Sequence, residues 1–126
     1  MRAVRTKRLW LYLLVALTLQ SFVTDCVARD TSQNRIRDVK LADLPEEARE
    51  TVALIKKGGP FPYNKDGAVF GNFERRLPVK QRGYYHEYTV PTPRSRDRGA
   101  RRIVTGRGEE YYYSDDHYKS FRRIRK

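Results

Sequence analysis

Three residues in the second half of the chain carry side chains that could together catalyse phosphoryl transfer. Glu87 lies in the run Tyr-Tyr-His-Glu-Tyr-Thr-Val, Arg102 ends the run Arg-Gly-Ala-Arg-Arg, and His117 follows two aspartates. A carboxylate can accept a proton, an imidazole can donate one, and a guanidinium can hold the phosphate between them. Brought together on one sheet, these side chains would favour metal-free phosphoryl transfer.

The composition of the chain favours an anionic partner. It has 126 residues, which is enough for one domain, and 27 Lys and Arg against 15 Asp and Glu give a net charge of +12. An excess of this size favours nucleic acid, an acidic membrane surface or an acidic protein as the partner. Nucleic acid is the partner that would also supply the phosphate.

Each of these residues also has a simpler explanation. Glu87 could form a cross-strand ion pair with an arginine, and a lone histidine such as His117 is often a surface or structural residue. Arg94 and Arg96 are interpreted as part of a solvated basic loop. A zinc site is not expected, because zinc needs three or four His, Cys or carboxylate ligands at suitable spacing. His86 is expected on the opposite face from Glu87, because neighbours in a strand alternate.

The N-terminus has the pattern of a secretory signal peptide over residues 1–28. A basic start precedes an apolar run at residues 9–19, and Cys26-Val27-Ala28 offers small residues before a cleavage site. The apolar run is shorter than the roughly 20 residues of a membrane span, although an uncleaved anchor remains the alternative. Cleavage after Ala28 would remove the only cysteine, and Asp25 argues against a lipoprotein. We therefore expect a secreted protein without a disulfide.

The expected fold of the mature chain begins with an arm and one helix. Residues 29–40 are polar and charged and are expected to form a mobile arm or a loose edge. A helix is predicted over residues 43–57, with Asp43 as its N-cap and an apolar stripe at helical spacing. Gly58 and Gly59 are predicted to end it.

Short β-type runs dominate the rest of the chain, which we assign to a single domain over residues 41–126. Aromatic and β-branched residues mark the expected strands, and Pro and Gly residues separate them. The predicted fold is α+β, with one N-terminal helix packed on a roughly five-stranded antiparallel sheet whose other face is free to form a groove. The expected strands are residues 68–70, 84–90, 101–105, 110–113 and 118–124.

Several of these motifs occur in an order that resembles the microbial guanyl-specific ribonucleases, the family that includes barnase. The resemblance is greatest to the small secreted enzymes of actinomycetes and covers about residues 41–121. The motifs that carry it are Gly-Pro-Phe-Pro-Tyr at 59–63, Gly-Tyr-Tyr-His-Glu-Tyr-Thr-Val at 83–90, Arg-Gly at 98–99, Arg-Arg-Ile at 101–103 and Asp-His-Tyr at 116–118.

The resemblance implies a role for each residue of the catalytic group. Glu87 corresponds to the general base, His117 to the general acid, and Arg98 and Arg102 to the arginines that bind the phosphate. Tyr118 corresponds to a tyrosine that helps to hold the phosphate. The implied reaction begins with attack of the ribose 2′-OH on the 3′-phosphate. It yields a 2′,3′-cyclic phosphate, which is then hydrolysed with the two proton-transfer roles reversed.

The resemblance also implies a guanine-binding loop at residues 70–74. The base would lie against Phe70, backbone amides near Asn72 would reach its O6 atom, and Glu74 would accept hydrogen bonds from N1–H and N2–H₂. Gly71 and Phe73 depart from the family, whose members carry a polar residue and an arginine there. The strictness of the guanine preference is therefore left open.

The partners implied by the resemblance are an RNA substrate and an acidic intracellular inhibitor of the barstar type. No cofactor is expected. We also expect a monomer without stable membrane association once the signal peptide is removed. Two alternatives remain: a non-catalytic cationic module that binds nucleic acid or cell surfaces, and the same ribonuclease acting as an antibacterial toxin.

Overall fold

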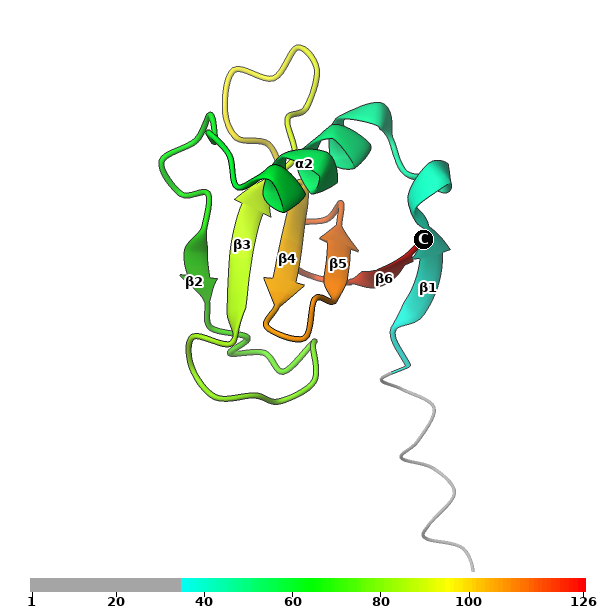
Figure 1. The fold of residues 1–126 in the computed structure, drawn as a ribbon, viewed down its shortest axis with the longest axis vertical. Helices are drawn as coiled ribbons and strands as arrows, with labels where there is room; N and C mark the ends of the chain where they lie inside the picture. Colours follow the sequence, from blue (N-terminus) through cyan, green and yellow to red (C-terminus); the bar gives the residue numbers. More distant parts are fainter. Residues whose placement is uncertain (1–34) are drawn as a thin grey trace, which may run out of the picture. The chain divides into compact units, whose positions relative to one another are not determined.

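The computed structural model describes residues 35–126, which contain one helical layer and one sheet. The predicted signal peptide and the first residues of the predicted arm lie outside the described residues. Within the compact unit at residues 36–126, helix α2 lies across one face of a six-stranded sheet (Figure 1). The strand order is β1-β6-β5-β4-β3-β2. The predicted α+β fold class is confirmed.

The sheet is mixed rather than fully antiparallel. Four of its pairings, from β2 to β6, are antiparallel, whereas β1 pairs with β6 in parallel. Strand β1 lies within the segment that the sequence assigned to an arm, so four of those residues form an edge strand. The strands are β1 (Arg37–Lys40), β2 (Ala68–Phe70), β3 (Tyr85–Thr89), β4 (Arg102–Gly106), β5 (Tyr111–Ser114) and β6 (Arg122–Arg125).

The helix begins later than its sequence predicts. A short 3₁₀ turn, η1 (Leu41–Asp43), precedes α2 (Glu46–Lys57), and Pro45 rather than Asp43 occupies the N-cap position. The ring of Pro45 holds the preceding residue in extended backbone, so the helix can start only after it. The predicted C-terminus is correct: Gly58 adopts a φ of 85° and donates its N–H to the carbonyl of Ile55.

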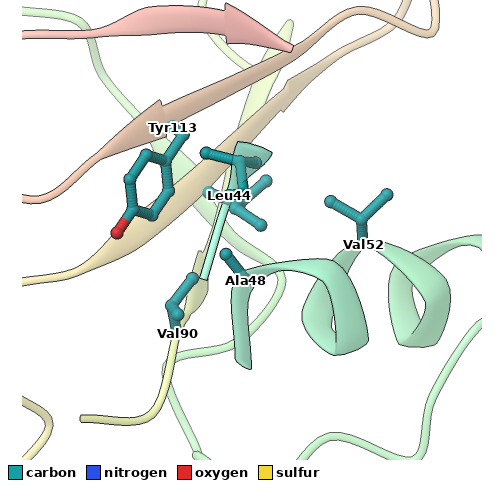
Figure 2. Close-up of a cluster of buried hydrophobic side chains, with 6 residues drawn as sticks. Leu44, Ala48, Val52, Val90 and Tyr113 are labelled. Carbon is teal, nitrogen blue, oxygen red and sulfur yellow. The ribbon is translucent and has the colours of Figure 1, made fainter. Parts of the chain in front are cut away.

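Two apolar clusters lie on opposite faces of the sheet. On the helix side, Ala48 and Val52 pack against Val90 of the loop after β3 and Tyr113 of β5 (Figure 2). A second cluster lies on the opposite face of the sheet, which is the face that carries Glu87. Each cluster uses alternate residues of the same strands, as the two-residue period of a strand requires. The buried members of the second cluster are Leu77, Tyr85, Val104, Tyr112 and Phe121.

The chain segment before β6 is a turn rather than the strand predicted from residue 118 onward. Asp116 accepts hydrogen bonds from the Ser114 hydroxyl at 3.0 Å and from the backbone N–H of Ser120 at 2.9 Å. These bonds close a compact loop that strand geometry could not make. Strand β6 therefore starts only at Arg122.

Candidate active site

Glu87 lies at the middle of β3 and is the centre of a network of charged and polar side chains. Its Oε2 atom accepts a hydrogen bond from the Tyr118 hydroxyl at 2.5 Å, and its Oε1 atom lies 3.3 Å from Nη2 of Arg98. The Glu87 side chain is 14% exposed, so both contacts are made at the edge of solvent. One carboxylate is thus held between a phenol and a guanidinium, with access from one side.

Arg102 opens β4 and is almost fully buried. Its Nη1 atom donates to the carbonyls of Gly99 at 2.9 Å and Arg101 at 2.8 Å, and Nε donates to the Tyr118 hydroxyl at 3.0 Å. Arg102 is 2% exposed, and these hydrogen bonds offset the free-energy cost of burying its charged guanidinium. A guanidinium fixed in this way presents a stationary positive charge beside Glu87.

His117 and Tyr118 are presented by the turn that precedes β6. Both adopt left-handed backbone, with φ of 58° and 68°, a conformation that is uncommon outside glycine. The turn is held at its base, because Tyr118 donates its N–H to the Ser114 hydroxyl at 3.0 Å. His117 donates its N–H to the carbonyl of Ala100 at 3.0 Å. The imidazole is exposed, and its ring centre lies 5.2 Å from that of Tyr118.

Tyr118 remains a protonated phenol throughout the physiological pH range. Burial and the hydrogen bond to Glu87 raise its pKa to about 12, although Arg102 opposes the shift. The hydroxyl therefore donates to Glu87 while accepting from Arg102. It links the carboxylate to the buried guanidinium.

A groove of about 450 Å³ opens over this network. Glu87, His117 and Tyr118 form one end of it, and the segment from Val69 to Glu74 forms the other. A carboxylate, an imidazole and a phenol beside an aromatic loop, with Arg98 and Arg102 bonded to that carboxylate and phenol, suit a ligand with a phosphate and a planar ring. The size and polarity of the groove fit one nucleotide.

The ribonuclease family model matches residues 27–125 of the chain. The chain belongs to the ribonuclease family. Guanyl-specific ribonuclease St of Saccharopolyspora erythraea is 63% identical over 84 residues, covering 67% of this chain and 83% of that protein. Guanyl-specific ribonuclease Sa of Kitasatospora aureofaciens is 56% identical over 84 residues, covering 66% of this chain and 88% of that protein.

Solved structures give the same assignment. Ribonuclease Sa2, determined in complexes with mononucleotides, superimposes with a TM-score of 0.72 at 55% identity, covering 73% of this chain and 96% of that chain. A structure of ribonuclease Sa2 with guanosine-2′-cyclophosphate has a TM-score of 0.69 at 55% identity, covering 72% and 97% of the two chains. The fold of this ribonuclease is therefore shared with experimentally determined relatives.

Asn72 organises the loop at residues 70–74, the predicted base-binding loop of this ribonuclease, through its own side chain. Its amide donates to the Leu77 carbonyl at 2.9 Å and accepts from the Leu77 N–H at 3.0 Å, so the middle of the loop is tied to Leu77. Asn72 adopts a φ of 51°. The side chain is used within the loop, which leaves backbone groups as the means by which this position could contact a base.

Glu74 and Phe70, in the same loop, have different surroundings. Glu74 is exposed, and its Oε2 atom is 3.2 Å from Nε of Arg76. Phe70 stacks on Tyr118, with ring centres 5.2 Å apart and an interplanar angle of 24°. The aromatic contact connects the loop to the turn that carries His117 and Tyr118.

The structure brings the predicted catalytic residues into one region. Glu87, Arg98, Arg102 and Tyr118 are joined by the contacts above, and His117 lines the same groove. His86 faces the other side of the sheet, as strand alternation predicts. The predicted base-binding residues Phe70, Asn72 and Glu74 all line the other end of the groove.

Sequence reasoning missed one supporting residue. The Thr89 hydroxyl accepts a hydrogen bond from Nε of Arg98 at 3.0 Å and so helps to direct that guanidinium toward Glu87. Thr89 lies two residues after Glu87 on β3, and the period of a strand therefore places it on the same face. That spacing was the signal available. Among residues 35–126, no group of three His, Cys, Asp or Glu side chains could hold a metal ion.

Proposed function

We propose that this chain is an endoribonuclease that cleaves single-stranded RNA on the 3′ side of guanosine. The observation that carries the proposal is the carboxylate of Glu87, held between Arg98 and Tyr118 in a groove that also contains His117. Its relatives of 56–63% identity are guanyl-specific ribonucleases. A related protein, ribonuclease Sa2, has been crystallised with guanosine-2′-cyclophosphate, a nucleotide of the kind such a reaction forms.

In this mechanism Glu87 is the general base and His117 is the general acid. Glu87 removes the proton from the ribose 2′-OH, whose oxygen attacks the adjacent phosphorus, while protonated His117 donates a proton to the leaving 5′-oxygen. The products are a 2′,3′-cyclic phosphate and a free 5′-hydroxyl. Water then opens the cyclic phosphate with the two roles exchanged. DNA is not a substrate because it lacks the 2′-OH.

Arg98, Arg102 and Tyr118 stabilise the negative charge that develops on the phosphoryl oxygens. Arg102 suits this role because its carbonyl partners fix it before substrate arrives, so little reorganisation is needed during the reaction. Tyr118 contributes a neutral donor. Substrate phosphate would compete with Glu87 for the groups that now contact the carboxylate, freeing it to act as the base.

Guanine recognition is assigned to the loop at residues 70–74. Glu74 can accept from the two adjacent donors N1–H and N2–H₂, an arrangement that only guanine among the common bases offers. Its present partner Arg76 is exposed, and an exposed ion pair is weak enough to rearrange. Phe70 supports the base, and backbone amides near Asn72 reach O6.

Digestion of a defined RNA tests this function directly. Incubation in EDTA, followed by mapping of the new ends, should give fragments that end in guanosine 2′,3′-cyclic phosphate and later 3′-phosphate. The Glu87→Ala variant should lose ~10²–10⁴-fold in rate, the usual worth of one proton-transfer group. Uncut RNA, or cuts distributed evenly over the four bases, would refute the assignment.

We also propose that the protein is secreted, acts as a monomer and is blocked inside the producing cell by an acidic inhibitor. The basic, apolar and small-residue pattern at residues 1–28 supports secretion. The net charge of +12 supports a negatively charged inhibitor. None of the helices within residues 35–126 is long and apolar enough to cross a membrane.

Three measurements test these additional proposals. Mass analysis of the culture medium should find a chain that begins near residue 29. Light scattering should give the mass of one chain. Affinity capture from the producing cell should recover an acidic protein that abolishes cleavage, and recovery of none would contradict the inhibitor proposal.

A further inference from the structure

Arg101 is the neighbour of Arg102, but its side chain serves the opposite side of the sheet. It donates to the Pro91 carbonyl at 2.5 Å through Nη2 and to the Thr92 hydroxyl at 3.2 Å through Nε. Its Nη1 atom lies 3.7 Å from Oε2 of Glu47 in α2. The side chain is 16% exposed. Arg101 thus fastens the start of the loop at residues 91–100 to the helix.

That loop supports three members of the proposed active site. It carries Arg98, and its Gly99 carbonyl accepts from the Arg102 guanidinium. Its Ala100 carbonyl accepts the His117 N–H, the backbone contact that locates the general acid. A shift of this loop would therefore move two arginines and the imidazole together.

Thr92 connects the Arg101 side chain to Gly99, in the part of the loop that supports the active-site residues. Gly99 packs so closely on Thr92 that a Cβ atom at Gly99 would lie 2.5 Å from the Thr92 hydroxyl oxygen. Arg101 holds that same hydroxyl. The backbone of Arg101 also closes the base of the loop, because its carbonyl accepts the Val90 N–H at 3.1 Å.

Residues 95–97, at the tip of the loop, are held by bonds within the loop itself. Asp97 accepts from the Gly99 N–H at 2.7 Å and from the Ser95 hydroxyl at 2.9 Å, and these residues are largely exposed. Such bonds shape the tip without fixing its place on the sheet. Among the described residues 35–126, the ion pair between Arg101 and Glu47 is the one that joins the base of this loop to α2.

We propose that Arg101 is a positioning residue for the phosphoryl-transfer reaction, acting by fixing the loop at residues 91–100 against α2. The proposal rests on the proposed function, because it concerns the geometry of the same site. Arg101 does not touch the groove. Its effect is exerted on the rate of the chemical step, since misplacement of reacting groups by about 1 Å can cost roughly 10²-fold.

Kinetics of three variants test the proposal with a guanylyl-(3′,5′)-nucleoside substrate. Arg101→Met should lower kcat by about 10- to 100-fold and leave KM within about threefold, because the base-binding loop at residues 70–74 is separate from the displaced loop. Arg101→Lys should recover part of kcat, since lysine keeps the charge but not the fork of donors. Glu47→Gln should give a smaller loss in kcat.

Two control variants separate positioning from stability. Val52→Ala removes core volume between α2 and the sheet without touching the loop, and Arg125→Met on β6 breaks an exposed ion pair with Asp38 on β1. Both should keep wild-type kcat at a temperature where they are folded. If Val52→Ala loses as much kcat as Arg101→Met at equal stability, the role of Arg101 is structural and the proposal fails.

Amide hydrogen exchange supplies a readout that does not depend on activity. The His117 N–H should exchange faster in Arg101→Met, while amides of β5 keep their protection. Unchanged His117 exchange together with unchanged kcat would overturn the proposal. If Arg101→Met does not fold, Arg101→Lys and Glu47→Gln decide by the same criteria. A wild-type protein inactive on guanylyl substrates would contradict the proposed function, whereas the exchange measurement would still test the anchoring.

Discussion

At the scale of single residues, the Tyr118 hydroxyl is the group on which most of the site depends. It donates to Glu87 at 2.5 Å and accepts from Nε of Arg102 at 3.0 Å, so one oxygen serves the base and the buried cation. Its raised pKa keeps the proton on the phenol at every pH at which the enzyme would act. Replacing Tyr118 by a residue without a hydroxyl would remove the hydrogen bonds to both Glu87 and Arg102.

Tyr118→Phe should therefore weaken both stability and catalysis. The change leaves Nε of Arg102 without its acceptor inside a residue that is 2% exposed, which costs about 1–3 kcal/mol of the free energy of unfolding. We also expect kcat/KM to fall at least about tenfold, because a donor to the reacting phosphate is lost. Urea unfolding and steady-state kinetics measure the two effects. Tyr84→Phe, whose hydroxyl contacts Glu110 outside the groove, is the matched control.

Gly71 and Phe73 lie in close contact in the loop at residues 70–74, and the effect of this contact on substrate binding can be tested. A Cβ atom at Gly71 would lie 2.5 Å from the Phe73 ring, and that ring is 85% exposed and free to move. Gly71→Ala should therefore displace the ring from the groove, raise KM for guanylyl substrates a few-fold and leave stability unchanged. Phe73→Ala should raise KM at least as much, by about fivefold, which is the lower end of the roughly 1–3 kcal/mol that base–aromatic contacts are worth.

A double-mutant cycle checks the cause. In the Phe73→Ala background, Gly71→Ala should have no further effect on KM, since there is no ring to displace. Additive effects of the two changes would show that Gly71 acts on the substrate by another route.

At the scale of elements, the alternation of side chains along β3 explains why the sequence alone could predict which residues of this strand belong to the site. Residues of one parity face α2, and those of the other parity, which include Glu87 and Thr89, face the groove. The helix stripe and its glycine stop were also predictable from local chemistry. The helix start was not, because the extended backbone imposed by Pro45 overrode the capping signal of Asp43.

The strand pairings at the sheet edge were hidden for a different reason. Strand β1 has one intermediate and three exposed residues, so its sequence lacks the apolar alternation that marks a strand. Its pairing with β6 is a long-range contact between the two ends of the domain. A turn was expected before the last strand, but its continuation to residue 120 was missed, because its bonds to Asp116 depend on side-chain geometry rather than on composition.

That turn should make the protein sensitive to acid. Burial is the largest single influence on Asp116 and raises its pKa, but the hydrogen bonds from Ser120 and Ser114 together outweigh it and lower the pKa below its ordinary value of 3.8. A carboxyl whose pKa is lowered on folding stabilises the native state above the unfolded pKa, and this contribution is lost as pH falls through the folded pKa. The difference in free energy of unfolding between wild type and Asp116→Asn should thus be constant above about pH 5 and narrow below pH 4.

Denaturant unfolding at a series of pH values measures this difference. Asp97, which is fully exposed and whose pKa is lowered by the Gly99 N–H and Ser95, provides the comparison on a turn that does not carry His117. A gap between wild type and Asp116→Asn that stays constant down to pH 2 would show that the turn does not depend on the ionised carboxylate.

At the scale of the whole molecule, the excess of positive charge acts beyond the residues that contact the reacting phosphate. Of the net charge of +12, +9 belongs to residues 29–126, which hold 23 Lys and Arg against 14 Asp and Glu, and these charges include the edge strand β1, the loops and β6. Composition alone predicted an anionic partner, but it could not distinguish catalysis from simple binding. The distinction came from Glu87, because a carboxylate placed among arginines opposes RNA binding unless it has a chemical role.

Salt dependence separates these two contributions in the enzyme. With long RNA, kcat/KM should fall steeply as salt rises, because each neutralised phosphate of a single strand contributes a slope of about −0.7 in log–log terms. With a guanylyl dinucleoside monophosphate the slope should be much shallower, because an isolated phosphate has no condensed counterions to release. Parallel kinetics on the two substrates from low to physiological salt measure both slopes. Equal slopes would mean that distant cations do not contact the strand, and the charge of the chain would then need another partner to explain it.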